Sequence, residues 1–500
     1  MTKQTPMEAL LDRWGEYEDI QHASMVLEWD QETHLPTGAG EARSQHLATL
    51  AGLSHEKLTA PAFRKALTAA ERDGSLKGRE QAMVREAKRT HDRARRVPRE
   101  LVMELALAES RGLAAWKTAR EEGQWSDFAE NLSTLVRLKR RLAEAVGYQD
   151  TPYDALLEDF EPGATVKQLD PLLGELKEAT VDLLGRIRRS KRRPDRKLLR
   201  RKFPKEGQLR LGRMVAETMG FDFTEGRLDL STHPFCTSFH MSDVRLTTRV
   251  DERDLKPSLF GVIHEAGHGL YEQGIGRELA RTPLGDSISL GIHESQSRLW
   301  ENLVGRSRPF WKHCLPRARR VFPEALRGVR LDDFVFAIND VRPSMIRVEA
   351  DEVTYNLHII LRYELEKELF SGELQPENLP EAWNRKMKEL LGIVPRNASE
   401  GVLQDIHWAM GLMGYFPTYS LGNLYACQLY NKARKSIRGL DRRVENGKLL
   451  PLRDWLRTSI HAPGKTYSAA ELIQRATGSP LSTKPFVDYA NAKFGELYGL

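Results

Sequence analysis

Hydrophobic and polar residues recur along most of the chain with the period of an α-helix. In the first such segment, Leu10, Trp14 and Tyr17 follow one another at spacings of four and three and so share one helix face. Pro98 and Gly147 add a start signal and a stop signal to two later segments. We predict helices over residues 7–25, 99–120, 127–146, 168–190, 257–272, 287–306, 346–371, 379–392, 400–414, 421–440, 451–459 and 468–476.

Strand patterns are rare by comparison. In residues 243–250, Val244, Leu246 and Val250 belong to an alternation of apolar or β-branched residues with polar ones, which predicts a strand. Residues 416–420 (FPTYS) are the second candidate. Since no linker rich in Pro, Gly or Ser divides the chain, we predict a single domain over residues 1–500. It would be mostly α, with two helical lobes facing a groove and a small sheet.

The composition fits a globular protein of the cytoplasm. The 500 residues are 40% hydrophobic and 29% charged, and the mean hydropathy is −0.51. No run of about 18 apolar residues predicts a membrane span, and the acidic first 30 residues do not resemble a signal peptide. Three cysteines cannot make a disulfide framework, so we expect a reducing, cytoplasmic location and no membrane partner.

The positive net charge comes from one segment. The window from Arg186 to Lys202 holds eleven Lys or Arg and one Asp, so it carries +10 and the rest of the chain carries −4. Such a window can bind nucleic acid. It lacks interleaved aromatic residues and a nucleic-acid-binding motif, so we favour a solvated helix end and loop and expect no nucleic-acid partner.

Residues 264–268 read His-Glu-Ala-Gly-His, an HEXXH motif whose spacing suits a metal site. Two helical histidines four positions apart differ by about 40° in azimuth and about 6 Å along the axis, so both rings reach one ion. Glu265 flanks His268 and is placed to accept a proton from water that a zinc ion activates. The competing interpretation is a buried histidine pair without a metal.

The residues around HEAGH favour a metal site over a buried histidine pair without a metal. Apolar residues on both sides supply a helix that carries the motif, and chance alone produces the motif about 0.05 times in such a chain. Gly267 inside this helix costs about 1 kcal/mol relative to Ala. Close packing or the approach of a substrate would account for that cost.

A catalytic zinc site needs a third protein ligand. Glu294 lies 26 residues beyond His268, far enough for a helix end, a turn and a returning helix. Glu301 and His293 are its rivals, and a solvated helix carboxylate is the alternative for Glu294 itself. Arg298, one helical turn beyond Glu294, cannot bind zinc.

Hydrolysis of a peptide also needs donors that stabilise the developing oxyanion. His407, Tyr415 and Tyr419 stand close together in the sequence, separated by Gly414 and Pro417, and are candidates to converge from a helix and a following loop or strand. Each of the three alone is more often a core residue. Their position downstream of the metal motif favours a functional role.

Several motifs together resemble one known family. The motifs HEAGH and HESQ resemble those of the carboxypeptidase Taq family of zinc metallocarboxypeptidases. The remaining motifs of that family are also present, in the same order along the chain. The similarity extends over essentially the whole chain, through WDQETHLP (29–36), His-Pro-Phe (233–235), Asp-x-Arg-x-Thr (243–247), Ile-Arg-x-x-Ala-Asp (346–351), Gly-x-x-Gln-Asp-x-His-Trp (401–408) and ELYGL (496–500).

The resemblance implies a fold similar to that of neurolysin and angiotensin-converting enzyme, with a deep active-site groove. It implies zinc on His264, His268 and Glu294, with Glu265 as general base. It also implies a homodimer that removes C-terminal residues from peptides with broad specificity and cleaves poorly next to proline. His407 and Tyr419 match residues that related peptidases place over the scissile carbonyl. Cobalt can replace zinc at such ligands.

A carboxypeptidase must bind a terminal carboxylate, and the planar fork of arginine suits that group. Arg347 is our first candidate and Arg245, on the predicted strand, is the second; Tyr415 is a further candidate for contacting the substrate. A surface ion pair is the alternative for either arginine. We consider Asp351, Asp243 and Asp405 as residues that orient the zinc histidines, and Cys236 as a small buried hydrophobe.

Two other functions remain open at this point. The first is an oligopeptidase or dipeptidyl peptidase with the same zinc chemistry, which the metal motif does not distinguish from a carboxypeptidase. The second is a non-catalytic interaction protein that binds RNA through residues 186–202. The intact ligand set and Glu265 count against the second.

Overall fold

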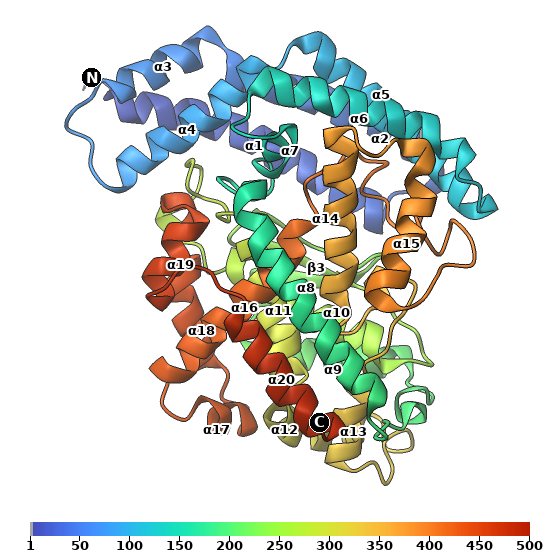
Figure 1. The fold of residues 1–500 in the computed structure, drawn as a ribbon. Coiled ribbons are helices and arrows are strands. Elements are labelled where there is room, and N and C mark those ends of the chain that lie inside the picture. The colour runs from blue at the N-terminus through green and yellow to red at the C-terminus, as the bar shows by residue number, and fades with distance from the viewer. Residues whose placement is uncertain (1–3) are drawn as a thin grey trace.

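Helices dominate the computed structural model, which describes residues 4–500 (Figure 1). The strands are β1 (Gly226–Leu230), β2 (Cys236–His240) and β3 (Asp243–Thr248). The α-helices are α1 (Pro6–Thr33), α2 (Gly40–Thr59), α3 (Pro61–Glu71), α4 (Arg79–Arg96), α5 (Arg99–Glu122), α6 (Ser126–Val146), α7 (Pro152–Leu157), α8 (Val166–Arg189), α9 (Lys205–Met219), α10 (Leu255–Glu272), α11 (Leu290–Arg298), α12 (Arg308–Val321), α13 (Leu331–Ile338), α14 (Tyr355–Ser371), α15 (Leu379–Leu391), α16 (Pro417–Ser436), α17 (Leu440–Glu445), α18 (Leu450–Leu456), α19 (Ala469–Thr477) and α20 (Lys484–Tyr498). The predicted mostly α architecture with a small sheet is therefore confirmed.

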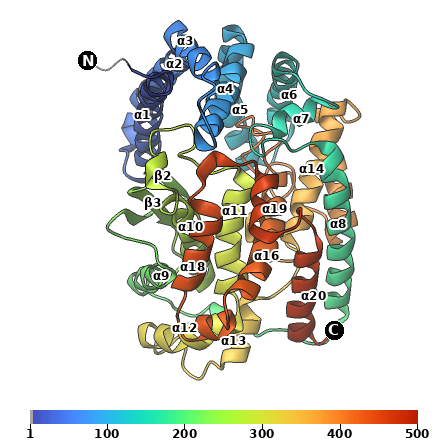
Figure 2. The same ribbon diagram turned by 90° about the vertical axis from the view of Figure 1, so that its left-hand side faces the viewer.

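The first six helices gather at one end of the molecule, and α12 and α13 lie at the other (Figures 1 and 2). Between these ends α11 packs against both α10 and α16. Within residues 4–500, no helix has both the length and the apolar sequence that a bilayer crossing requires. The division into two lobes around a groove stays a prediction.

The sheet lies against the helix that carries HEAGH. Its strand order is β1-β3-β2, with β1 parallel and β2 antiparallel to β3. Leu246 on β3 is fully buried and faces Gly269 of α10, where an added Cβ would come within 2.9 Å of the leucine side chain. The predicted strand over residues 243–250 is confirmed as β3. The sequence pattern did not predict β1 and β2, which have five residues each.

Two predictions around residue 410 are wrong. The predicted helix over residues 400–414 is a series of turns, in which Gly411 and Gly414 adopt left-handed conformations with φ of 67° and 93°. Gly414 donates its backbone N–H to the buried carboxylate of Glu366, which holds the turn. The predicted strand over residues 416–420 is the first turn of α16, because Pro417 takes the first helical position, where its missing N–H costs nothing.

The predicted helix over residues 346–371 begins nine residues later, at Tyr355. Asp351 accepts the backbone N–H groups of Val353 and Thr354, and this local bonding replaces the first helical turns. A short 3₁₀ turn occupies Arg347–Glu349. Helices that the pattern did not reveal also form, including α2, α3, α4, α9, α12, α13 and α20.

The basic segment takes part in the fold. Arg192 donates to the backbone carbonyl of Glu496 at 2.9 Å, Arg188 donates to that of Leu391, and Arg201 donates to that of Ala325. The first two carbonyls belong to the last turns of α20 and α15, where helix carbonyls lack partners and attract positive charge. Arg196 adds a two-bond ion pair with Asp340. These arginines therefore tie helix ends together.

Gly267 is the point where α10 and α11 touch. A Cβ at this position would lie 2.6 Å from the Cα of Ser297 and 2.8 Å from the carbonyl oxygen of Gln296. Both are backbone atoms of α11, so neither moves without shifting that helix. Close packing therefore accounts for a glycine inside the HEAGH helix.

We expect Gly267→Ala to destabilise the protein by about 1–3 kcal/mol, because the overpacking outweighs the gain in helix propensity. The matched control is Gly495→Ala, in the interior of α20, where an added Cβ meets nothing within 4 Å. That change should stabilise the protein by about 1 kcal/mol. Thermal unfolding followed by circular dichroism measures both; an unchanged midpoint for Gly267→Ala would contradict the close packing.

Candidate metal centre

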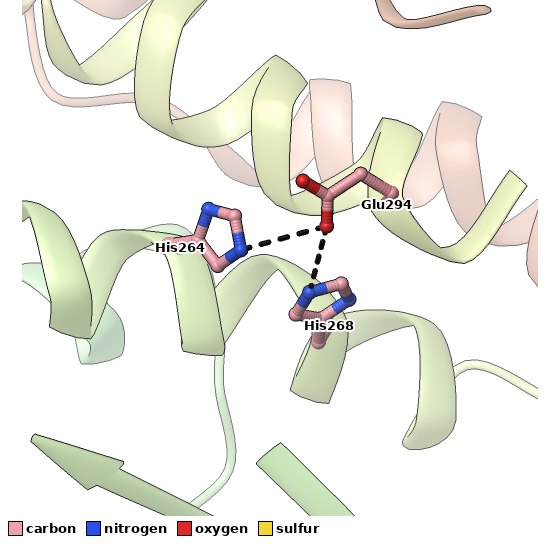
Figure 3. A group of neighbouring side chains, drawn as sticks. All are labelled: His264, His268 and Glu294. Carbon is pink, nitrogen blue, oxygen red and sulfur yellow. Dashed lines mark ion pairs between the residues drawn. The ribbon is translucent and has the colours of Figure 1, made fainter. Parts of the chain in front are cut away.

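Two neighbouring helices bring three metal-binding side chains together (Figure 3). The Oε2 atom of Glu294 lies 3.6 Å from Nε2 of His264 and 3.4 Å from Nε2 of His268. One donor atom from each residue lies within 4.8 Å of the others. The two histidines come from α10 and the glutamate from α11, so the contact at Gly267 sets these distances.

The donor set fits a zinc ion. Nitrogen and oxygen ligands at about 2.1 Å in a tetrahedral arrangement are separated from one another by about 3.4 Å. The two measured distances to Glu294 are close to this value. Two imidazoles and one carboxylate also leave a fourth position open, as in catalytic zinc sites.

Glu301 orients one of the histidines. It lies in the π-helical turn Leu299–Gly305 that continues α11, and its Oε2 atom is 2.9 Å from Nδ1 of His264. This bond leaves Nε2 of His264 directed at Glu294. Glu301 therefore acts through His264 and is not one of the three clustered donors, although the sequence left it open as a rival ligand.

His293, the other rival, points elsewhere. Its Nε2 atom is 2.8 Å from Oε1 of Glu272, and its ring stacks on that of His268 with centroids 4.3 Å apart. The stacking restricts the plane of the His268 ring. His293 therefore contacts His268, whereas Glu301 contacts His264.

Arg298 holds the ligand carboxylate of Glu294. Its Nε atom donates to Oε1 of Glu294 at 2.6 Å, which leaves Oε2 for the metal. Burial opposes charge on Glu294, but Arg298 and His264 hold its pKa well below the usual range. Burial likewise opposes charge on His264, yet Glu294 and Glu301 raise its pKa to about 10. The space between these groups therefore favours a positive charge.

Glu265 has a different environment. Burial raises its pKa to about 7, and His264 partly opposes this rise. A carboxyl group with a pKa near neutrality is suited to accept and return a proton. Burial also raises the pKa of the neighbouring Cys236 well above its usual value, so its thiol stays neutral.

His407, Tyr415 and Tyr419 do converge. Nε2 of His407 is 3.2 Å from the hydroxyl oxygen of Tyr419, and the rings of Tyr415 and Tyr419 have centroids 5.2 Å apart. Burial and the charge of Arg347 lower the pKa of His407 to about 3, so its ring is neutral.

Helix α16 brings this aromatic group to the candidate metal ligands. At Gly422, one turn beyond Tyr419, an added Cβ would lie 2.5 Å from Cγ of Glu294. The backbone of α16 therefore touches the ligand side chain directly. The sequence indicated Tyr419 as a candidate, but this contact depends on helix packing.

Arg347 is held in a buried ionic cluster. Its Nε and Nη2 atoms donate to Oδ1 of Asp405 at 3.0 and 2.8 Å, and Nη1 donates to the hydroxyl of Tyr355 at 2.9 Å. Arg362 donates to the other Asp405 oxygen at 2.7 Å. The guanidinium of Arg347 lies 5.0 Å from the ring centre of Tyr419. Arg347 is thus next to the aromatic group.

Arg347 keeps unused donors in this cluster. A guanidinium has five N–H groups, and three of those on Arg347 have partners among residues 4–500. One remains on Nη1 and one on Nη2. Two arginines around one aspartate also leave a net positive charge.

Arg245 has other contacts. It pairs with Asp243 at 2.9 and 3.0 Å, and its guanidinium lies over the rings of Trp29 and Phe239 at 4.2 and 4.7 Å. These contacts join β3 to α1. The structure does not link Arg245 to the metal ligands or to Tyr419 through any described contact.

None of the three aspartates considered as partners of the zinc histidines contacts His264 or His268 among residues 4–500. Asp405 binds two arginines, Asp243 binds Arg245, and Asp351 accepts backbone N–H groups. Glu301 takes that role because seven positions are close to two helical turns, which place it on the same face as Glu294. The same spacing argument places Arg298, four positions on, on the face of Glu294, but the contact of Glu301 with His264 depends on how α10 packs on α11.

The comparisons with known proteins agree with one another. The family model described as carboxypeptidase Taq (M32) metallopeptidase matches residues 9–494. Thermostable carboxypeptidase 1 of Thermus thermophilus is 44% identical over 100% of both chains, and carboxypeptidase 1 of Bacillus subtilis is 40% identical over 98% of this chain and 97% of its own. The crystal structure of an M32 carboxypeptidase from Deinococcus radiodurans is similar with a TM-score of 0.97, at 38% identity, over 99% of this chain and 100% of that one.

We expect Glu301→Gln to weaken zinc binding by about 10- to 100-fold, because His264 loses the carboxylate that orients it. Competition with a chelator of known zinc affinity measures the change. Glu400→Gln is the matched control, since Glu400 forms an exposed ion pair with Arg396. Equal zinc affinities for the wild type and Glu301→Gln would contradict the role of Glu301.

Proposed function

The chain belongs to the carboxypeptidase Taq (M32) family of metallopeptidases and is a metallocarboxypeptidase; from this premise we propose that it releases C-terminal amino acids from peptides with zinc held by His264, His268 and Glu294. The proposal includes broad side-chain specificity and poor cleavage next to proline, which the family resemblance implies. Cobalt is expected to replace zinc at the same ligands.

One observation carries the proposal. A three-residue donor group with tetrahedral spacing touches α16, and that helix carries Tyr419 beside the guanidinium of Arg347. A hydrolytic centre and a positively charged group are therefore held close together. That is the arrangement required to cut the peptide bond nearest a terminal carboxylate.

Zinc in this site would supply Lewis-acid polarisation of the scissile carbonyl and lower the pKa of water. Glu265 accepts the proton of the attacking water and returns it to the leaving amine. Its elevated pKa suits both transfers. The two steps restore the carboxylate of Glu265, so the cycle can repeat.

His407 and Tyr419 act on the carbonyl oxygen. The hydroxyl of Tyr419 donates to the oxygen as negative charge develops, while the neutral His407 holds that hydroxyl in place. Tyr415 packs against the rings of His407 and Tyr419. Because these rings are buried or half-buried, their bonds to the substrate form in a region of low dielectric.

Arg347 binds the C-terminal carboxylate through its two unused N–H groups. These donors sit on different nitrogens, as bidentate binding requires. The carboxylate also neutralises the excess charge of Arg347, Arg362 and Asp405. Recognition and charge balance therefore favour a peptide with a free C-terminus as the substrate.

We further propose a homodimer located in the cytoplasm. The family resemblance supports the dimer, and the paucity of cysteines supports the location. No interaction with nucleic acid or membrane is needed for the proposed activity.

The proposed function is tested with a tripeptide that has a blocked N-terminus and a free C-terminus, with products followed by mass spectrometry. We expect loss of single C-terminal residues, abolished by a chelator and restored by zinc or cobalt. Glu265→Gln should keep its zinc and lose activity by about 10²- to 10⁴-fold. Internal cleavage or release of dipeptides would instead indicate an oligopeptidase or a dipeptidyl peptidase, and substantial turnover by Glu265→Gln would contradict its role as base.

We expect Arg347→Ala to lower kcat/KM on a free-acid peptide by about 100-fold, because a buried charge pair with the substrate is lost. On the C-terminally amidated peptide the loss should be far smaller. Arg245→Ala, the matched control, should affect both peptides equally. Equal losses on acid and amide for Arg347→Ala would make it a structural residue.

A further inference from the structure

Tyr355 bridges the arginine that binds the substrate carboxylate and the arginine that holds a metal ligand. Its hydroxyl accepts a hydrogen bond from Nη1 of Arg347 at 2.9 Å. The guanidinium of Arg298 lies over the ring of Tyr355, 4.2 Å from its centre. Arg298 in turn donates to Glu294 at 2.6 Å. A continuous set of contacts thus runs from Arg347 to Glu294.

We propose that Tyr355 and Arg298 are positioning residues that couple the binding of a substrate's C-terminal carboxylate at Arg347 to the metal ligand Glu294. The inference rests on the proposed function and deepens it. It explains how an enzyme whose hydrolytic centre suits any peptide bond can favour the bond next to a free C-terminus. Binding of the carboxylate would help to assemble the centre that cuts.

The contacts are buried, which makes each of them effective. Tyr355 and Arg347 are each 5% exposed, and Glu294 is 6% exposed. Charges and hydrogen bonds interact more strongly at the low dielectric of such a region than in water. A cation over an aromatic face is likewise worth more when both groups are desolvated. A displacement of one of these side chains therefore changes the interaction energy of the side chain it contacts.

Arg298 reaches the metal centre by two routes. Besides its bond to Glu294, its Nη1 atom lies 3.4 Å from Oε2 of Glu301, the oxygen that contacts His264. The position of Arg298 therefore affects one metal ligand directly and a second one through Glu301. The ring of Tyr355 restricts where Arg298 can lie.

The direction of the coupling follows from these contacts. Arg347 is already bonded to Asp405 and Tyr355, and a carboxylate on its two unused donors restricts the plane of its guanidinium further. That plane sets the position of the Tyr355 hydroxyl, and the fixed ring then restricts Arg298 beside Glu294. Since thermodynamic coupling is reciprocal, a free-acid peptide should tighten zinc binding more than its amide does.

The test measures zinc affinity by chelator competition in the inactive Glu265→Gln protein, with a saturating free-acid peptide or with its amide. Couplings of this kind are about 5- to 150-fold, so we expect the acid to raise zinc affinity at least about 5-fold more than the amide. Tyr355→Phe keeps the ring and removes only the hydroxyl. In that variant the difference between acid and amide should fall below about 2-fold.

Tyr363→Phe is the matched control. Tyr363 is a buried tyrosine on the same helix, and its hydroxyl is bonded to Asp170 at 2.7 Å instead of to an arginine of the site. The loss of that hydroxyl should leave the acid–amide difference in zinc affinity unchanged. In the active protein, Tyr355→Phe should lower kcat on the free acid more than it raises KM, since the substrate still has Arg347.

Arg298→Lys provides a second variant, which keeps the charge and loses the planar group. We expect it to reduce the acid–amide difference as Tyr355→Phe does. The double variant should reduce the difference no further than either single variant, because both changes interrupt one set of contacts. Additive reductions would contradict a single route.

The proposal is overturned if the wild type shows no acid–amide difference in zinc affinity, or if Tyr355→Phe retains the wild-type difference. Equal loss of zinc affinity with acid and amide would also overturn it, since a purely structural role predicts that result. Arg347→Ala separates this failure from that of the proposed function. If Arg347→Ala keeps the preference for the acid, the carboxylate site is misassigned; if Arg347→Ala removes it and Tyr355→Phe does not, only the coupling fails.

Discussion

The close packing of α10 on α11 is the constraint on which the metal centre depends. Gly267 lets the two backbones approach until no side chain fits between them. At that separation the histidines of one helix and Glu294 of the other point into one small volume (Figure 3). At Gly422 the backbone of α16, which carries Tyr419, likewise approaches the side chain of Glu294 closely. Two glycines thus set the positions of ligands and aromatic residues that lie more than 100 residues apart.

The buried carboxylates Glu294, Glu301 and Asp405 are tolerated because each is paired with an arginine. Unpaired buried charge is strongly destabilising, whereas hydrogen-bonded pairs are tolerated. Glu294 has Arg298, Glu301 has Arg306 and His264, and Asp405 has Arg347 and Arg362. Around Asp405 two arginines face one carboxylate, and this excess positive charge matches the proposed substrate carboxylate. At the histidines, Glu294 and Glu301 raise the pKa of His264, which shows that they favour a cation there.

The basic segment shows how position in the fold changes the meaning of a charge pattern. Its concentration of Lys and Arg is the main source of the net charge. In the folded chain several of these side chains donate to carbonyls at the ends of α15 and α20 or pair with Asp340. From the sequence alone, nucleic-acid binding is one possible meaning of this charge, and a solvated helix end and loop is the favoured one. Their hydrogen bonds fasten the end of α8 and the segment after it to α15, α20 and Asp340.

The sequence by itself determined the helical class, the strand β3, and the candidate ligands His264, His268 and Glu294, because periodicity and motif spacing are local properties. It did not reveal that residues 400–414 form turns, since the buried carboxylate that holds Gly414 comes from α14. Nor did it reveal the partner of His264 or the bridge through Tyr355. Those depend on which helices touch and on how buried charges pair, and such contacts between distant segments are decided only when the chain packs.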